Sequence, residues 1–189
     1  MASSEPIALL GGTFDPPHLG HLVLAECARA QFDVAKVVFL PAGEPWRKAT
    51  RPVTPAEHRL AMVRLAVEGN PNFEVDDREV RRPGPTYTVE TLEALRAEGL
   101  HNLLFILGSD AIADLPNWKH PERITELARI VVARKAADGD LPTEYPIVGM
   151  PSLAISSTEV RARVVAGKPI RYLVPDAVER YIREHNLYR

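Results

Sequence analysis

Short apolar segments alternate with amphipathic segments along most of this chain, and this alternation constrains the fold more than any other feature. Strands that alternate with helices are typical of a parallel sheet, because each parallel connection needs a crossover. The expected strands are Ile7–Leu10, Lys36–Leu40, Phe73–Val75, Leu103–Leu107, Ile130–Ala133 and Ile147–Met150. The expected helices are Leu19–Gln31, Pro55–Glu68, Val89–Ala97, Asp110–Leu115, Pro121–Leu127, Ser157–Ala166 and Pro175–His185. The sequence therefore predicts an α/β fold, a Rossmann-like doubly wound parallel sheet in a single domain spanning residues 1–189.

The composition limits the partners that we expect. Hydrophobic residues make up 46% of the chain and charged residues 25%, and no run approaches the roughly 20 apolar residues of a membrane span. The net charge of -2 argues against a general nucleic-acid binder. The single cysteine, Cys27, has no partner for an internal disulfide, and the first residues lack the features of a secretory signal. We therefore expect a cytoplasmic protein without nucleic-acid or membrane partners, whose surface pattern allows a monomer or a homo-oligomer.

The segment from Ile7 to His21 joins a strand, a glycine turn and a helix start. Gly11 and Gly12 let the backbone approach a ligand closely, and the helix begins near Leu19. A helix N-terminus has unpaired N–H groups and about half a positive charge, so it stabilises an anion. Ligands of doubly wound sheets bind beyond the carboxyl ends of the strands, where this loop lies. The segment therefore predicts a phosphate site.

Two histidines strengthen the prediction of a phosphate site. The spacing of His18 and His21 places their Cβ atoms about 5–6 Å apart on one face of the first turn, which suits neighbouring oxygens of one polyphosphate. Gly20 between them leaves room for a base or sugar. The alternatives are a helix cap, plain solvent exposure and a zinc site. Zinc on a helix more often uses histidines at i and i+4 with an added Cys, Asp or Glu, and the nearby Glu26 and Cys27 point elsewhere on the helix.

Several motifs follow one another along the chain, namely Gly11–His21, Gly84–Leu92, Leu107–Asp110, Asn117–Trp118 and Ile155–Arg161. With these motifs the chain resembles the His-x-Gly-His nucleotidylyltransferase superfamily, and within it the bacterial nicotinate-nucleotide adenylyltransferases. The resemblance covers essentially the whole chain. It implies that ATP and nicotinate mononucleotide, with Mg²⁺, are converted to deamido-NAD and pyrophosphate.

The resemblance assigns the first motif to ATP. His18 and His21 would contact the phosphates, and His21 would most directly stabilise charge at the α-phosphate. Backbone groups around Gly11, Gly12 and Phe14 would line the phosphate and ribose site.

The resemblance assigns Ile155–Arg161 to the β- and γ-phosphates. Ser156 or Ser157 would cap a helix whose free N–H groups face these phosphates, and Arg161 would follow one turn later. Ser156 and Glu159 also form a capping box, so an ordinary N-cap is the alternative. Together with the first motif, phosphate binding is the better interpretation.

Further basic residues are assigned to the polyphosphate by the same resemblance. Lys48 matches the family, whereas Trp46 and Arg47 depart from the usual pattern and acquire no role from it. An exposed, solvated basic pair is the alternative for Arg47 and Lys48. Arg134 matches a family arginine, although the usual Arg-Pro-Gly turn is altered here. The composition of Lys135–Pro146 predicts a mobile surface loop.

The middle motifs imply the pyridine pocket. Thr88 matches a threonine that hydrogen-bonds the nicotinate carboxylate, and Trp118 matches an aromatic residue that stacks on the ring. Backbone N–H groups around Trp118 would hold the carboxylate, and Thr86 is a weaker candidate. Asp110 would cap a helix or bind a ribose hydroxyl. Core packing is the alternative for Trp118.

The reaction that the resemblance implies needs no strong general base, because the attacking phosphate is already largely ionised near neutral pH. This agrees with the lack of a convincing Ser-His-Asp, catalytic-cysteine or paired-carboxylate pattern. We expect no protein metal site, and Asp15 is only a weak candidate for holding magnesium indirectly. The alternatives are a phosphopantetheine adenylyltransferase, a cytidylyltransferase and a non-catalytic nucleotide-binding module.

Overall fold

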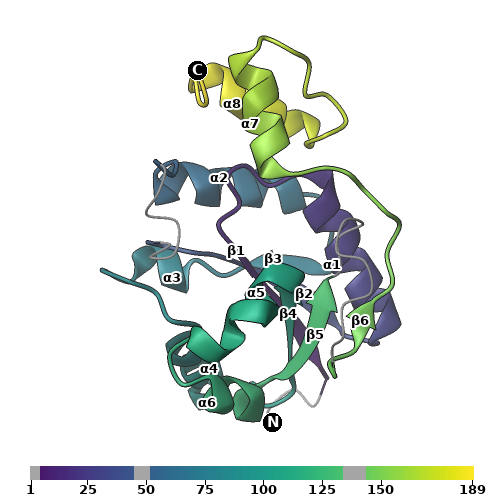
Figure 1. Cartoon of the computed structure of the whole chain (residues 1–189), viewed down its shortest axis with the longest axis vertical. Helices are drawn as coiled ribbons and strands as arrows, with labels where there is room; N and C mark the ends of the chain where they lie inside the picture. The colour runs from purple at the N-terminus through teal and green to yellow at the C-terminus, as the bar shows by residue number, and fades with distance from the viewer. Residues whose placement is uncertain (1–4, 45–51, 134–143) are drawn as a thin grey trace.

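The computed structural model describes residues 5–44, 52–133 and 144–189. Its centre is a six-stranded sheet with the order β3-β2-β1-β4-β5-β6, in which every neighbouring pair is parallel (Figure 1). The strands are β1 Ile7–Gly12, β2 Lys36–Pro41, β3 Phe73–Val75, β4 Leu103–Gly108, β5 Arg129–Ala133 and β6 Ile147–Val148. This order reverses between β1 and β4, as in a Rossmann-like fold, so the expected fold class is confirmed.

Helices cover both faces of the sheet, which explains why the central strands are apolar throughout. Ala8 and Leu10 of β1 face a core shared with α1 and α2, whereas Ile7 and Leu9 face a second core shared with α4 and α6. The helices are α1 Leu19–Gln31, α2 Ala56–Val67, α3 Arg78–Arg81, α4 Thr88–Ala97, α5 Ser109–Asp114, α6 Pro121–Leu127, α7 Ser157–Val165 and α8 Asp176–Glu184, with a 3₁₀ turn, η2, at Leu115–Asn117. Within the described ranges, no helix is long and apolar enough to cross a membrane.

The last two helices pack on the outer side of α2 and not on the sheet (Figure 1). Their apolar contact joins Met62 of α2 to Val160 of α7 and Val178 of α8, all fully buried. Backbone bonding ties this layer to the start of α1, where the Leu19 N–H donates to the Leu173 carbonyl at 2.9 Å. The C-terminal helices therefore lie next to the loop between β1 and α1.

The sequence did not predict helix α3. It starts after Asp76, whose side chain accepts a hydrogen bond from the Arg78 N–H at 2.9 Å. The Arg78 guanidinium also pairs with Asp76 and with Glu98 at the end of α4. A single helical turn shows no periodicity in a sequence, so only these contacts reveal it.

Candidate active site

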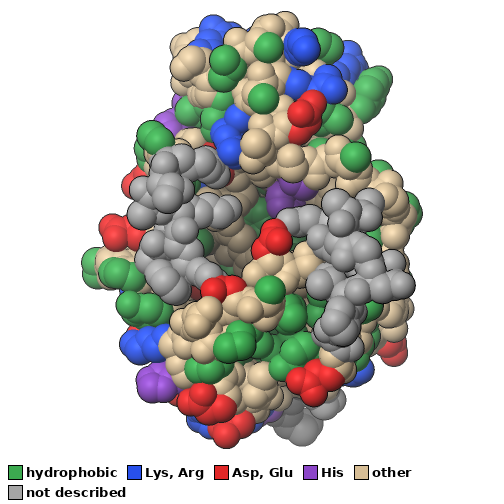
Figure 2. Space-filling model, viewed as in Figure 1, with side chains coloured by type: hydrophobic (Ala, Val, Ile, Leu, Met, Phe, Trp, Pro, Cys, Tyr) green, Lys and Arg blue, Asp and Glu red, His purple; other side chains and the backbone are tan. Residues whose placement is uncertain are grey.

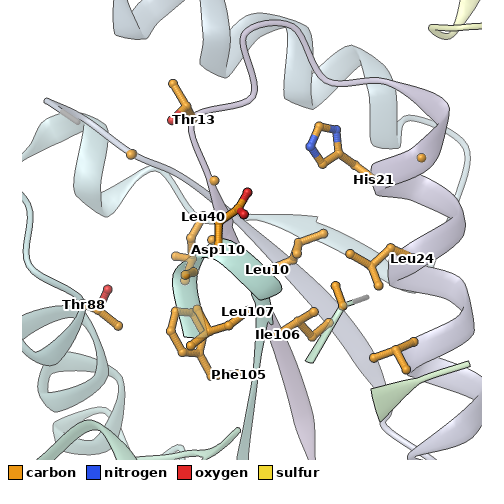
Figure 3. Close-up of a pocket in the computed structure, with 18 of the residues that line it drawn as sticks. Leu10, Thr13, His21, Leu24, Leu40, Thr88, Phe105, Ile106, Leu107 and Asp110 are labelled. Carbon is orange, nitrogen blue, oxygen red and sulfur yellow. The ribbon is translucent and has the colours of Figure 1, made fainter. Parts of the chain in front are cut away.

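A cleft of about 1180 Å³ opens at the carboxyl ends of the strands. The face shown in Figure 2 is hollowed near its middle, with histidine and acidic side chains at the margin. In Figure 3, His21 and Leu24 of α1 lie on one side, Thr88 of α4 on the other, and Asp110 between them. The residues on the α1 side are Gly11, Gly12, Thr13, His18, Gly20, His21 and Leu24, those on the α4 side include Glu79, Thr86, Tyr87, Thr88, Thr91, Trp118 and Lys119, and residues 147–156 form a further wall.

The two histidines of the first motif are in contact. The rings of His18 and His21 stack with centroids 3.7 Å apart and an interplanar angle of 27°. His18 is the N-cap of α1, and its backbone N–H donates to Nδ1 of His21 at 3.1 Å. Because Nδ1 accepts this bond, the proton of neutral His21 is on Nε2. The helix-cap interpretation is therefore confirmed, and the bond to Nδ1 leaves Nε2 as the donor of His21.

His18 is neutral at physiological pH. Its side chain is buried, and desolvation lowers its pKa to about 4. Gly20 lines the cleft, and a Cβ at that position would lie 3.0 Å from ring atoms of His18. The residue expected to leave room for a ligand therefore leaves room for this imidazole.

The Phe14 ring packs directly against the glycine turn. Gly11 and Gly12 line the cleft, and a Cβ on Gly12 would approach the Phe14 ring to 3.0 Å. The Phe14 ring is buried. Its centroid lies 5.0 Å from that of the His21 ring, which it meets edge-on, and 5.8 Å from that of the Phe39 ring. The Phe14 side chain thus belongs to the core and holds the turn and His21 in place.

A buried arginine that the sequence reasoning missed holds the same loop. Arg59 of α2 is 1% exposed, and its guanidinium donates to the carbonyls of Thr13 at 2.8 Å, Gly43 at 2.7 Å and Thr54 at 2.8 Å. One planar group thereby joins the loop after β1 to two segments between β2 and α2. The available sequence signal was a charged residue on the inward face of an apolar helix.

Asp15 is committed to internal contacts. Its side chain is 2% exposed and accepts a hydrogen bond from the Tyr188 hydroxyl at 2.8 Å. Burial and the Asp15 charge raise the pKa of Tyr188, so the hydroxyl stays a donor. The Arg161 guanidinium donates to the Asp15 carbonyl at 2.6 Å and to Thr158 Oγ1 at 3.1 Å. Neither Asp15 nor Arg161 lines the cleft as the structure describes it, and both organise the loop that carries His18.

The two serines at the start of α7 have different contacts. Ser156 lines the cleft and caps the helix, since its Oγ accepts from the Glu159 N–H at 3.1 Å. The Ser157 hydroxyl donates to the Pro16 carbonyl at 2.8 Å. Glu159 pairs with Arg163 at 2.7 Å. The N-terminus of α7 is therefore fixed against the histidine loop, on the same side of the cleft as His18.

The opposite end of the cleft contains the middle motifs. Thr88 is the first residue of α4, and Trp118 follows η2. The Trp118 indole donates from Nε1 to Asp114 at 3.1 Å, and its backbone N–H donates to the Leu115 carbonyl at 3.0 Å. The N–H of Trp118 itself is thus bonded inside the chain, and a carboxylate contact of the neighbouring N–H groups stays a prediction.

Asp110 lies in the second position of α5, whose N-cap is Gly108. The expectation that Asp110 caps this helix is therefore wrong, because the helix begins earlier than predicted. Its exposed side chain lines the middle of the cleft (Figure 3).

Glu79 is a second acidic residue of the cleft, and it lies on the unpredicted helix α3. It accepts a hydrogen bond from the Thr91 hydroxyl at 2.8 Å, and burial raises its pKa. Thr86, the weaker candidate, is buried and also lines the cleft.

Some expected residues lie outside the described part of the chain: Trp46, Arg47, Lys48, Arg134 and most of the loop Lys135–Pro146. Within the described residues, no group of three or more His, Cys, Asp and Glu side chains is arranged to hold a metal ion.

Comparisons with known proteins identify the family and the fold. Residues 9–163 match the model of the cytidylyltransferase-like family. The chain is 51% identical to the "Probable nicotinate-nucleotide adenylyltransferase" of Roseiflexus sp. (strain RS-1), over 99% of this chain and 100% of that protein. It is 45% identical to the protein of the same name from Thermomicrobium roseum, over 97% of this chain and 91% of that one. The structure of Plasmodium falciparum nicotinic acid mononucleotide adenylyltransferase complexed with NaAD has a TM-score of 0.79 over 97% of both chains; at 20% identity this likeness shows the fold alone.

Proposed function

This chain belongs to the cytidylyltransferase-like family, and we infer that it transfers the adenylyl group of ATP to nicotinate mononucleotide, giving deamido-NAD and pyrophosphate. The observation that carries this conclusion is a single cleft whose two ends differ in chemistry. One end has the stacked His18 and His21 beside a helix N-terminus, which suits a polyphosphate. The other has Thr88 and Trp118, which suit a pyridine ring with a polar substituent.

The chemical step is an in-line displacement. A phosphate oxygen of the mononucleotide forms a bond to the α-phosphorus of ATP while the bond to the bridging oxygen of the β-phosphate breaks. The electron pair of that bond leaves with pyrophosphate. The attacking oxygen is already ionised, so the protein has to align the two substrates and stabilise the charge of the transition state.

The histidine pair stabilises this charge. Nδ1 of His21 is occupied by the His18 backbone N–H, so Nε2–H is the group that donates to an α-phosphate oxygen. His18 stays neutral and also serves as a phosphate ligand. A donor held by a helix cap and an aromatic contact loses little freedom when the substrate binds.

The remaining ATP contacts come from backbone and basic groups. The phosphate and ribose groups bind to Gly11, Gly12 and the backbone around Phe14. The β- and γ-phosphates bind at the N-terminus of α7, which Ser156 and Ser157 hold in place. Arg161 supports the phosphate site by holding the histidine loop through the Asp15 carbonyl. Lys48 and Arg134 complete the set as charge-neutralising groups.

The mononucleotide occupies the α4 end of the cleft. Trp118 stacks on the pyridine, Thr88 contacts its carboxylate, and Asp110 binds a ribose hydroxyl in the middle of the cleft. Mg²⁺ would be brought in by the phosphates of ATP and would help to neutralise their charge, as is usual for this ion at phosphoryl-transfer sites. We propose that the reaction takes place in the cytoplasm and that residues 1–189 form one catalytic domain.

Pyrophosphate release tests the proposed function. The protein is incubated with ATP and Mg²⁺ and, in parallel, with nicotinate mononucleotide, nicotinamide mononucleotide or phosphopantetheine as acceptor. We expect a strong preference for nicotinate mononucleotide. Activity with phosphopantetheine alone would assign the chain to another branch of the superfamily, and no activity with any acceptor would support a nucleotide-binding module.

A further inference from the structure

Lys119 lines the α4 end of the cleft, and it is the only lysine or arginine among the described residues that line the cleft. We propose that its ammonium group is a specificity determinant that favours the nicotinate carboxylate over the nicotinamide group. This proposal rests on the proposed function and concerns the same cleft. It assigns the preference to a side chain that none of the motifs singled out.

Two contacts place the Lys119 ammonium at the first turn of α4. Nζ lies 4.4 Å from the centroid of the Tyr87 ring and 2.7 Å from Oε1 of Glu90. Tyr87 is the N-cap of α4 and Glu90 is in its first turn. The hydrogen bond to Glu90 raises the pKa of Lys119, so the ammonium is charged at neutral pH. The cation therefore lies close to Thr88, the residue assigned to the carboxylate.

The start of α4 adds a positive potential of its own. Among the residues that the structure describes, no side chain caps this helix, and the N–H groups of Glu90 and Thr91 are bonded to the Tyr87 carbonyl. The N–H groups that precede them are at the positive end of the helix dipole, on the cleft side where Thr88 lies. Helix and ammonium therefore attract the same kind of ligand group, a carboxylate.

The other charged side chains of the described cleft are acidic, so they oppose the binding of an acidic substrate. Glu79 and Asp110 also line the cleft. A carboxylate side chain disfavours a second negative charge close to it, such as that of an acidic substrate. A neutral amide meets no such repulsion, so these two residues lower the preference for nicotinate over nicotinamide. The ammonium opposes this effect because its hydrogen bond to a carboxylate is charge-assisted, whereas its bond to an amide oxygen has one neutral partner.

Trp118 positions the pyridine ring relative to Lys119. It precedes Lys119 in the chain, and its indole is fixed by the bond to Asp114. A pyridine stacked on this indole presents its 3-substituent at the ring edge, within reach of the flexible lysine. Glu90 accepts a hydrogen bond from the ammonium at 2.7 Å, and in the proposed complex the ammonium exchanges Glu90 for the substrate carboxylate or bridges both.

The test compares two substrates on the same protein. The ratio of kcat/KM for nicotinate mononucleotide to kcat/KM for nicotinamide mononucleotide is measured at saturating Mg-ATP for wild type, Lys119→Met and Lys119→Arg. Lys36→Met is the matched control, because Lys36 forms a similar pair with Glu74 at 2.8 Å but is the first residue of β2, at the amino ends of the strands and away from the cleft. A partial loss of folded protein cancels in the ratio.

We expect Lys119→Met to lower the ratio about fivefold, mainly through a higher KM for the acid, as befits a partly exposed ion pair. Lys119→Arg keeps most of the ratio, and Lys36→Met leaves it unchanged. In wild type the ratio falls as ionic strength rises, whereas in Lys119→Met it does not.

The outcomes separate the two proposals. A wild-type protein without activity on nicotinate mononucleotide, or one that prefers the amide, refutes the proposed function. A wild-type protein that prefers the acid, together with a Lys119→Met variant of unchanged ratio, refutes the role of Lys119 and leaves the proposed function standing. Equal loss of activity on both substrates also refutes that role.

Discussion

Burial of the His18 imidazole predicts a loss of stability in acid that belongs to this one residue. Desolvation lowers the pKa of His18 from 6.5 to about 4 in the folded protein. The unfolded chain takes up a proton near pH 6.5, where the folded protein does not, so acid favours the unfolded state. The effect is absent above the unfolded pKa, grows as the pH falls from about 6.5, and is complete below about 4.

The size of this effect follows from the two pKa values. Each pKa unit corresponds to about 1.4 kcal/mol, so the free energy of unfolding falls by about 2 kcal/mol between pH ~7.5 and pH ~5, and by about 3 kcal/mol when the pH is below the folded pKa. His18→Asn removes the titrating ring and supplies a favourable N-cap for α1. The variant should therefore lack this part of the acid sensitivity.

Urea unfolding of wild type and His18→Asn at several pH values between about 7.5 and 5 measures the difference directly. We expect the stability difference between the two proteins to shift by about 2 kcal/mol in favour of the variant as the pH falls. His120→Asn is the control, because His120 is also a helix N-cap but its side chain is 64% exposed. Parallel pH profiles for wild type and His18→Asn would refute the buried, neutral His18.

Three further predictions concern the cleft and its support. His21→Ala is expected to lower kcat by a factor on the order of 10² or more, since it removes a fixed donor at the α-phosphate; single-turnover kinetics with near-normal rates would remove His21 from the mechanism. Trp118→Ala should raise the KM for the mononucleotide and leave that for ATP nearly unchanged, whereas equal changes in both would indicate a folding role. Arg59→Met removes the donor to the buried Gly43 carbonyl and to the partly buried carbonyls of Thr13 and Thr54, and it should lower the free energy of unfolding by about 3–5 kcal/mol in denaturant titrations. The exposed Arg163→Met should cost less than about 1 kcal/mol, and similar losses for both arginines would contradict the bracing role of Arg59.

Much of the fold could be read from local patterns. Helices Leu19–Gln31 and Pro121–Leu127 and strand Phe73–Val75 have the predicted bounds. The other predicted helices and strands differ by a few residues at their ends, because caps and ladder contacts set the ends and periodicity does not. Helix α3 was not predicted because it is only one turn long. The strand predicted as Ile147–Met150 covers only Ile147–Val148 because it pairs only with the end of β5.

In the candidate site, too, some features follow from local sequence patterns and others only from tertiary contacts. The sequence by itself determined the parallel α/β fold, the glycine turn and the adjoining pair His18 and His21, because each depends on residues that are close together in the chain. Only the tertiary structure decided how that loop is held, since Tyr188 reaches Asp15 across 173 residues and Arg161 reaches it across 146. It also decided which charges share the far end of the cleft with Trp118. The physical reason is that burial, pKa and hydrogen-bond geometry depend on neighbours in space, which a local pattern does not contain.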